Sequence, residues 1–91
     1  MKIEEVLSNK LYGSLVRVDN VECGRKGWVC LDPRGEYLDE KVSDRLYAQV
    51  LTAWSSGGEV TLTTAGANDV FVPSCGGEKR GFPVIEDFRS Q

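Results

Sequence analysis

Histidine is absent from this 91-residue sequence, and histidine is the side chain that most often transfers protons near neutral pH. The patterns Ser-x-x-Lys and Gly-x-Ser-x-Gly, which carry nucleophilic serines, are absent too. Hydrolytic and acid–base catalysis therefore lack a recognisable set of residues, and we predict that the protein is not an enzyme. Zinc sites use histidines or Cys-x-x-Cys pairs, neither of which occurs here, so no metal and no cofactor are expected.

Long apolar runs are also absent. No segment approaches the ~20 apolar residues that a helix needs to cross a bilayer. Residues 1–10 carry two glutamates where a secretory signal peptide has its apolar segment. We therefore expect no membrane span, and either a cytoplasmic protein or an exported one whose signal peptide has been removed.

Neither sign of charge is in large excess. The chain has 11 basic and 14 acidic residues, a net charge of -3, and no blocks of like charge. Such a surface offers no extended positive field, which makes nucleic acid an unfavourable partner. Hydrophobic residues make up 41% of the chain and charged residues 27%, which is typical of a globular protein. A chain of this length supports one core, so a single domain over residues 1–91 is predicted.

Cysteine is scarce, and the three cysteines, Cys23, Cys30 and Cys75, allow one bridge with a thiol left over. In the chain-entropy model a bridge from Cys23 to Cys75 is worth about 4 kcal/mol, against about 2.5 kcal/mol for Cys23 to Cys30. Cys23 and Cys75 both lie beside glycines, as loop cysteines do, whereas Cys30 lies in the apolar run GWVCL like a small core residue. We predict a Cys23–Cys75 disulfide, with three reduced thiols in a cytosolic protein as the alternative.

The spacing of apolar residues predicts one helix and five strands. The helix should begin at Asp39 or Lys41 and end at Ser55, because Gly57 and Gly58 supply the positive φ of a helix C-terminus. Its apolar face is expected to comprise Val42, Leu46, Val50, Leu51 and Trp54. The strands are predicted at residues 2–7, 11–18, 27–31, 59–64 and 82–88.

The predicted order β-β-β-α-β-β indicates a mainly β protein with one helix. In so short a chain this is the order of the OB-fold, a five-stranded barrel with a helix between the third and fourth strands. The apolar face of the helix would then plug one end of the barrel. An α+β sandwich, with the helix on one open sheet, is the alternative.

The stretch LYAQVLTAWSSGGEVTLTT, followed by a cysteine in SCGG and then by GFPVIEDF, resembles small secreted bacterial proteins related to the B subunit of subtilase cytotoxin. In that family a helix with a tyrosine and alanines runs into Ser-Gly or Thr-Gly, then a strand, a cysteine and a final strand. Cys23 also falls where many members have a cysteine. The resemblance covers residues 11–88 and implies an OB-fold and a ring-shaped pentamer. In the toxin members it implies binding of host cell-surface glycans.

Four residues are candidates for ligand contacts: Trp28, Asp32, Arg34 and Tyr37. Trp28 begins a predicted strand beside basic residues, and an aromatic ring flanked by polar groups is suited to stack on a sugar or a base. The other three lie in the following loop, where they can hydrogen-bond hydroxyl groups. The alternative for Trp28 is inward packing with Cys30, because strand alternation puts both residues on one face.

Assembly follows from size as well as from the resemblance. A barrel this small has a thin core, which disulfides or surface buried between subunits commonly supplement. Trp54 is expected in the core or in a subunit contact, with Tyr47 near the same border of the helix. Strand edges can be covered by a neighbouring copy. We predict a closed homo-oligomer, a pentamer before a dimer.

Two classes of function remain. The first is a non-catalytic, secreted or periplasmic binding subunit that recognises a glycan or a protein partner as a symmetric oligomer. The second is a cytoplasmic OB module that binds single-stranded nucleic acid or another small ligand, which needs stacking aromatics and a basic groove. The acidic balance of the chain favours the first.

Overall fold

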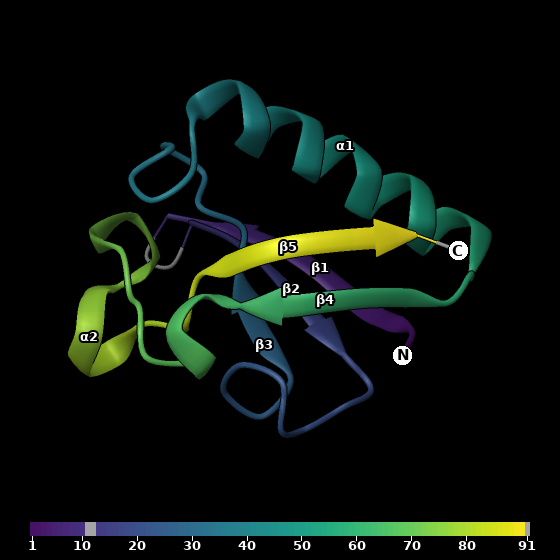
Figure 1. Cartoon of the computed structure of the whole chain (residues 1–91), viewed down its shortest axis with the longest axis horizontal. Helices are drawn as coiled ribbons and strands as arrows, with labels where there is room; N and C mark the ends of the chain where they lie inside the picture. Colours follow the sequence, from purple (N-terminus) through teal and green to yellow (C-terminus); the bar gives the residue numbers. More distant parts are fainter. Residues whose placement is uncertain (11–12, 91) are drawn as a thin grey trace.

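The computed structural model describes residues 1–10 and 13–90 and contains five strands and one long helix (Figure 1). The strands are β1 (Ile3–Asn9), β2 (Gly13–Val18), β3 (Trp28–Cys30), β4 (Val60–Thr64) and β5 (Ile85–Ser90). The long helix α1 (Glu40–Ser56) separates β3 from β4. The predicted order β-β-β-α-β-β is confirmed, although the first two residues of the strand predicted at 11–18 lie outside the described residues.

The connection between β4 and β5 is more structured than the predicted loop. It contains two 3-10 turns, η1 (Ala65–Ala67) and η2 (Pro73–Cys75), and a four-residue helix, α2 (Gly77–Arg80). Figure 1 shows α2 at the end of the molecule opposite both chain termini. None of the helices in the described part of the chain is long and apolar enough to span a membrane.

Helix α1 begins between the two predicted starts, Asp39 and Lys41, and ends one residue after the predicted Ser55. The side chain of Asp39 accepts a hydrogen bond from the N–H of Lys41, which caps the N-terminus. Gly57 has φ 69°, and its N–H donates to the carbonyls of Ala53 and Trp54, which closes the C-terminus in the left-handed conformation that glycine adopts most readily.

The predicted apolar face of α1 is confirmed at Leu46 and Val50 and wrong at its flanks. The buried positions are Ser43, Leu46, Val50 and Ala53. Val42 and Trp54 are each 42% exposed, so Trp54 does not belong to the core. The reason is the helical period. The buried stripe runs through residues 43, 46, 50 and 53, so residues 42 and 54 lie on its two flanks, where apolar side chains remain partly exposed.

Strand β5 begins three residues later than the predicted start at residue 82. Pro83 has no N–H to donate to a ladder, and its carbonyl instead accepts a hydrogen bond of 2.8 Å from the N–H of Cys30. Val84 forms a single parallel bridge with Cys30. The segment 82–84 therefore joins β3 before the chain enters its pairing with β4.

The strands form two antiparallel sheets, one of order β1-β2-β3 and one of order β4-β5. Between them, the described residues form only single bridges, Lys2 with Glu59 and Cys30 with Val84. Continuous ladders do not run around the structure, so a closed OB-fold barrel is not confirmed. The coarser prediction, a mainly β protein with one long helix, is confirmed.

The two faces of the β1-β2-β3 sheet pack against different parts of the chain. Val16 and Val29 face a core that includes α1, β4 and β5. Leu15 and Cys30, which alternate with them along the strands, face a second cluster supplied mainly by the connection 65–84. That connection therefore covers the face of β2 and β3 that points away from the main core.

The disulfide joins Cys30 to Cys75, and the predicted Cys23–Cys75 pair is wrong. Cys30 lies on the face of β3 that the connection 65–84 covers, and both bridged cysteines are fully buried. Cys23 lies in the β2–β3 turn, half-buried and free, and burial raises the pKa of its thiol. Which cysteines pair is therefore set by the face of β3 on which Cys30 lies, more than by loop length or neighbouring glycines.

Thiol counting on denatured, unreduced protein should find one reactive cysteine, which peptide mapping should identify as Cys23. The variant Cys23→Ser should leave stability close to that of the native protein. Cys30→Ser should cost about 4 kcal/mol of unfolding free energy, because it opens a loop of 45 residues. Three reactive thiols, or a free Cys30 in the native chain, would contradict the observed pairing.

Candidate functional site

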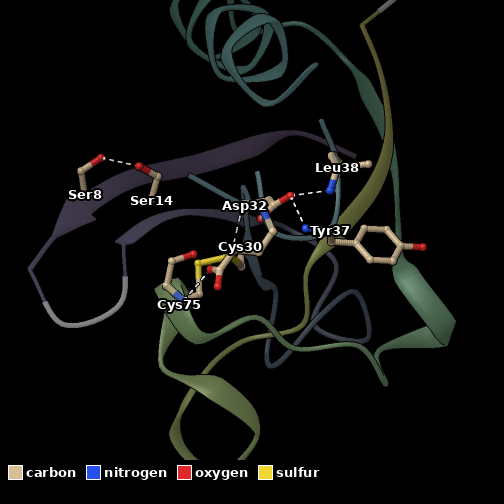
Figure 2. The surroundings of a disulfide bond; sticks show 9 residues. Ser8, Ser14, Cys30, Asp32, Tyr37, Leu38 and Cys75 are labelled. Atoms are coloured by element: carbon tan, nitrogen blue, oxygen red, sulfur yellow. Dashed lines mark hydrogen bonds between the residues drawn. A yellow bond between two sulfur atoms is a disulfide. The ribbon is translucent and has the colours of Figure 1, made fainter. Parts of the chain in front are cut away.

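The loop between β3 and α1, residues 31–39, is organised around the carboxylate of Asp32. Asp32 has φ 54° and is fully buried. Its carboxylate accepts hydrogen bonds from the backbone N–H groups of Glu36 at 2.8 Å, Tyr37 at 3.0 Å and Leu38 at 2.6 Å. Figure 2 shows the last two of these bonds, with the Tyr37 ring directed away from Asp32. The loop is thus folded around one side chain.

This arrangement stabilises the loop in the absence of any ligand. A buried carboxylate without partners is strongly unfavourable, whereas hydrogen bonds to a charged group contribute about 1.5–3 kcal/mol each. The carbonyl of Asp32 also accepts a bond from the N–H of Gly35, which tightens the turn. The three hydrogen bonds to the Asp32 carboxylate form only when the loop keeps this conformation.

Two further contacts attach the loop to the C-terminal half of the chain. A carboxylate oxygen of Glu36 accepts a hydrogen bond from the N–H of Ser74 at 2.9 Å. The side chain and the backbone N–H of Ser74 lower the pKa of Glu36. The Tyr37 hydroxyl donates to Glu86 at 3.3 Å, and the charge of Glu86 raises the pKa of Tyr37. These contacts attach Glu36 to the connection 65–84 and Tyr37 to β5.

The structure separates the four predicted ligand-contact residues. Arg34 and Tyr37 lie exposed on the loop, and Tyr37 is 44% exposed. Asp32 lies beneath them with its carboxylate occupied by the backbone, so it shapes the loop and is not placed to meet a ligand. Ligand contact by Arg34 and Tyr37 remains a prediction.

Trp28 lies apart from the loop, at the start of β3. It is half-buried and packs in the cluster that contains Cys30, as the alternative for this residue proposed. Its ring centroid lies 6.3 Å from that of Phe82, and the Arg17 guanidinium lies 5.6 Å above it. Arg17 in turn forms a salt bridge with Glu5 at 3.2 Å. The Trp28 ring is therefore already in contact with protein groups on two sides.

A cavity of about 110 Å³ lies where the loop meets α1. Its lining residues are Ser14, Leu31, Pro33, Ser43, Asp44 and Tyr47. Ser43 is only 3% exposed, and its hydroxyl has no hydrogen-bond partner among the described residues. Ser43 is not among the residues predicted for the apolar face of the helix. The spacing 43, 46, 50, 53 was the signal that would have placed it on the buried face.

Polar side chains lie on the loop and around the cavity. The groups present are a guanidinium, two phenols, serine hydroxyls and carboxylates, which donate and accept hydrogen bonds. No group of three or more possible metal-ligating residues occurs in the part of the chain described. No family model matches this chain, and neither curated proteins nor solved structures are significantly similar to it.

Proposed function

We propose that the protein is a non-catalytic binding subunit, similar to toxin B subunits, that recognises a glycan or a protein partner. The observation that carries the proposal is the loop 31–39, which the Asp32 carboxylate holds in one conformation while Arg34 and Tyr37 face solvent. A preformed loop avoids much of the entropy loss of ordering on binding. Tyrosine and arginine are also the residues that most often dominate recognition surfaces.

The proposed architecture is an OB-fold barrel with two narrow seams, by which we mean the two places where a single bridge joins one sheet to the other. One seam is the antiparallel bridge of Lys2 with Glu59, beside which Met1 and Val60 exchange backbone bonds of 2.7 and 3.0 Å. The other is the parallel bridge of Cys30 with Val84. Together with the two sheets these bridges give the cyclic order β1-β2-β3-β5-β4, which supports the partly open, five-stranded barrel of the OB-fold.

Single-stranded nucleic acid fits the structure less well than a glycan. OB-folds bind oligonucleotides on the face of the second and third strands, and here the connection 65–84 covers that face of β2 and β3. Trp28, the aromatic residue on it, already has the Arg17 guanidinium over its ring and the tilted ring of Phe82 beside it. The net charge of -3 also opposes binding of a polyanion.

The buried disulfide supports an exported protein, for which we propose a secreted or periplasmic location. Disulfides persist in oxidising compartments and are rare in the cytosol. Cys30 and Cys75 are both fully buried and belong to the second hydrophobic cluster. The bond therefore has the position of a structural staple and not that of a reactive surface thiol pair.

The proposed assembly is a ring of identical copies. Tyr47, Leu51 and Trp54 follow one flank of α1 at four- and three-residue spacing, and each is partly exposed. Val42, also 42% exposed, lies on the opposite flank. Two different surfaces on opposite flanks allow a heterologous contact, and such contacts generate rings when the rotation between copies closes.

Sedimentation at micromolar concentration should therefore detect a species several times heavier than the 10.0 kDa chain, with five copies the expected number. Trp54→Glu should dissociate it, because a charge would then be buried in the contact. Val21→Glu, at a position 72% exposed in the β2–β3 turn, serves as the control and should leave the mass unchanged. A monomer that persists as concentration rises would remove the ring from the proposal.

Binding to a glycan array should depend on the exposed loop. Tyr37→Ala and Arg34→Ala should each reduce binding about tenfold, as expected for central aromatic and arginine contacts. The control Val21→Ala alters an exposed side chain outside the loop and should bind as the native protein does. If array binding is absent, or is indifferent to both loop substitutions, glycan recognition by this loop is wrong.

A further inference from the structure

Strand β5 lies at an edge of its sheet. It pairs with β4 along one side, and among the described residues no strand pairs with its other side. The preceding segment 82–84 is joined to Cys30 by a single bridge at Val84, before β5 begins at Ile85. An edge strand presents unpaired backbone N–H and C=O groups, to which a strand of another chain can pair.

The register identifies the backbone groups of β5 that face this open side. Both the N–H and the C=O of Val60 bond to Met1, on the side of β4 that lies away from β5. Orientation alternates along an antiparallel ladder, so Leu62 also points away from β5, and its partner Phe88 points away from β4. The N–H of Phe88 donates to the side chain of Asp87 at 3.0 Å, as expected for a group without a strand partner.

The open side of β5 is in contact with solvent. A groove of about 220 Å³ lies between α1 and β5, so the helix does not seal this edge. Asp87 and Arg89 are both exposed. They line a second hollow together with Thr61 and Thr63, the residues with which they pair, so the two charged side chains share the outer face of the strand.

We propose that the open edge of β5 pairs with the same edge of a second copy of this chain, antiparallel and about a two-fold axis at Phe88. The two Phe88 residues then exchange backbone hydrogen bonds, and Asp87 of each copy lies opposite Arg89 of the other. These positions are the non-hydrogen-bonded pairs on either side of the centre, where side chains approach most closely. Opposite charges in such pairs are stabilising.

Charge complementarity favours both this register and a second copy as the partner. The segment Asp87-Phe88-Arg89 is complementary to itself when it is read antiparallel. A pair centred on Asp87 or on Arg89 would instead place like charges opposite each other, which is destabilising. A self-complementary surface of this kind is what a two-fold contact requires.

The inference goes beyond the proposed function and does not depend on the ring. The proposed ring contact uses the flanks of α1, whereas this contact uses the edge and the outer face of β5. Two short strands bury less than the ~1,200 Å² of a stable interface, so we expect the pair to form at about 0.1–1 mM protein. Association at micromolar concentration therefore reports on the ring, and association at millimolar concentration reports on the β5 pair.

Sedimentation from micromolar to millimolar concentration tests the pair. The mass should rise toward twice its micromolar value, whether the micromolar species is a ring or a single chain. Arg89→Asp should abolish this rise, because carboxylates would then lie opposite carboxylates on both sides of the two-fold axis.

A charge exchange separates this pairing from a general effect of charge. Asp87→Arg combined with Arg89→Asp should restore the rise, since opposite charges still meet across the axis. An equimolar mixture of the two single variants should also associate, although neither does so alone. Lys41→Asp makes the same reversal of charge at an exposed position of α1 and is the control, which should associate as the native protein does.

The β5 pair is overturned if the native protein keeps its micromolar mass at millimolar concentration, or if Arg89→Asp associates as the native protein does. It is also overturned if neither the double variant nor the mixture associates, or if Lys41→Asp abolishes association. A micromolar species of 10.0 kDa that doubles at millimolar concentration would remove the ring and leave the pair standing.

Discussion

The buried carboxylate of Asp32 and its three backbone donors are the constraint on which the conformation of loop 31–39 depends. The chain leaves β3 at a bridged cysteine and must reach the start of α1 at Glu40. A charge in the interior is tolerated only when its hydrogen bonds are satisfied. The connection is therefore folded around Asp32 in a single way, which leaves Arg34 and Tyr37 outside and directs Leu31 and Pro33 to the cavity.

The Cys30–Cys75 bond has a comparable effect on the other side of the sheet. It holds the connection 65–84 against β2 and β3, where a second hydrophobic cluster forms. A small domain gains stability from such a staple, since its main core is limited by its size. The same contact occupies the strand face that OB-folds otherwise use for ligands. The surface proposed for recognition lies elsewhere, where loop 31–39 meets α1.

Local patterns predicted the order of the elements and the ends of the long helix, because capping by Asp39 and Gly57 is chemistry of neighbouring residues. The disulfide was missed, since the pairing depends on which face of a three-residue strand Cys30 occupies. Asp32 was predicted to contact a ligand because a carboxylate in a loop can hydrogen-bond hydroxyl groups. Its burial follows from three N–H groups that only the folded loop brings together. Ser43 was missed through a shift of one residue in the helical phase.

Amide hydrogen exchange in the ligand-free protein tests most directly whether loop 31–39, the proposed recognition loop, is preformed. The amides of Glu36, Tyr37 and Leu38 should exchange slowly, because each donates to the Asp32 carboxylate. In Asp32→Asn, which keeps one acceptor oxygen instead of two, at least one of them should exchange much faster, while the buried amide of Val50 in α1 keeps its protection. Fast exchange of all three amides in the native protein would contradict a loop that is fixed before its ligand arrives.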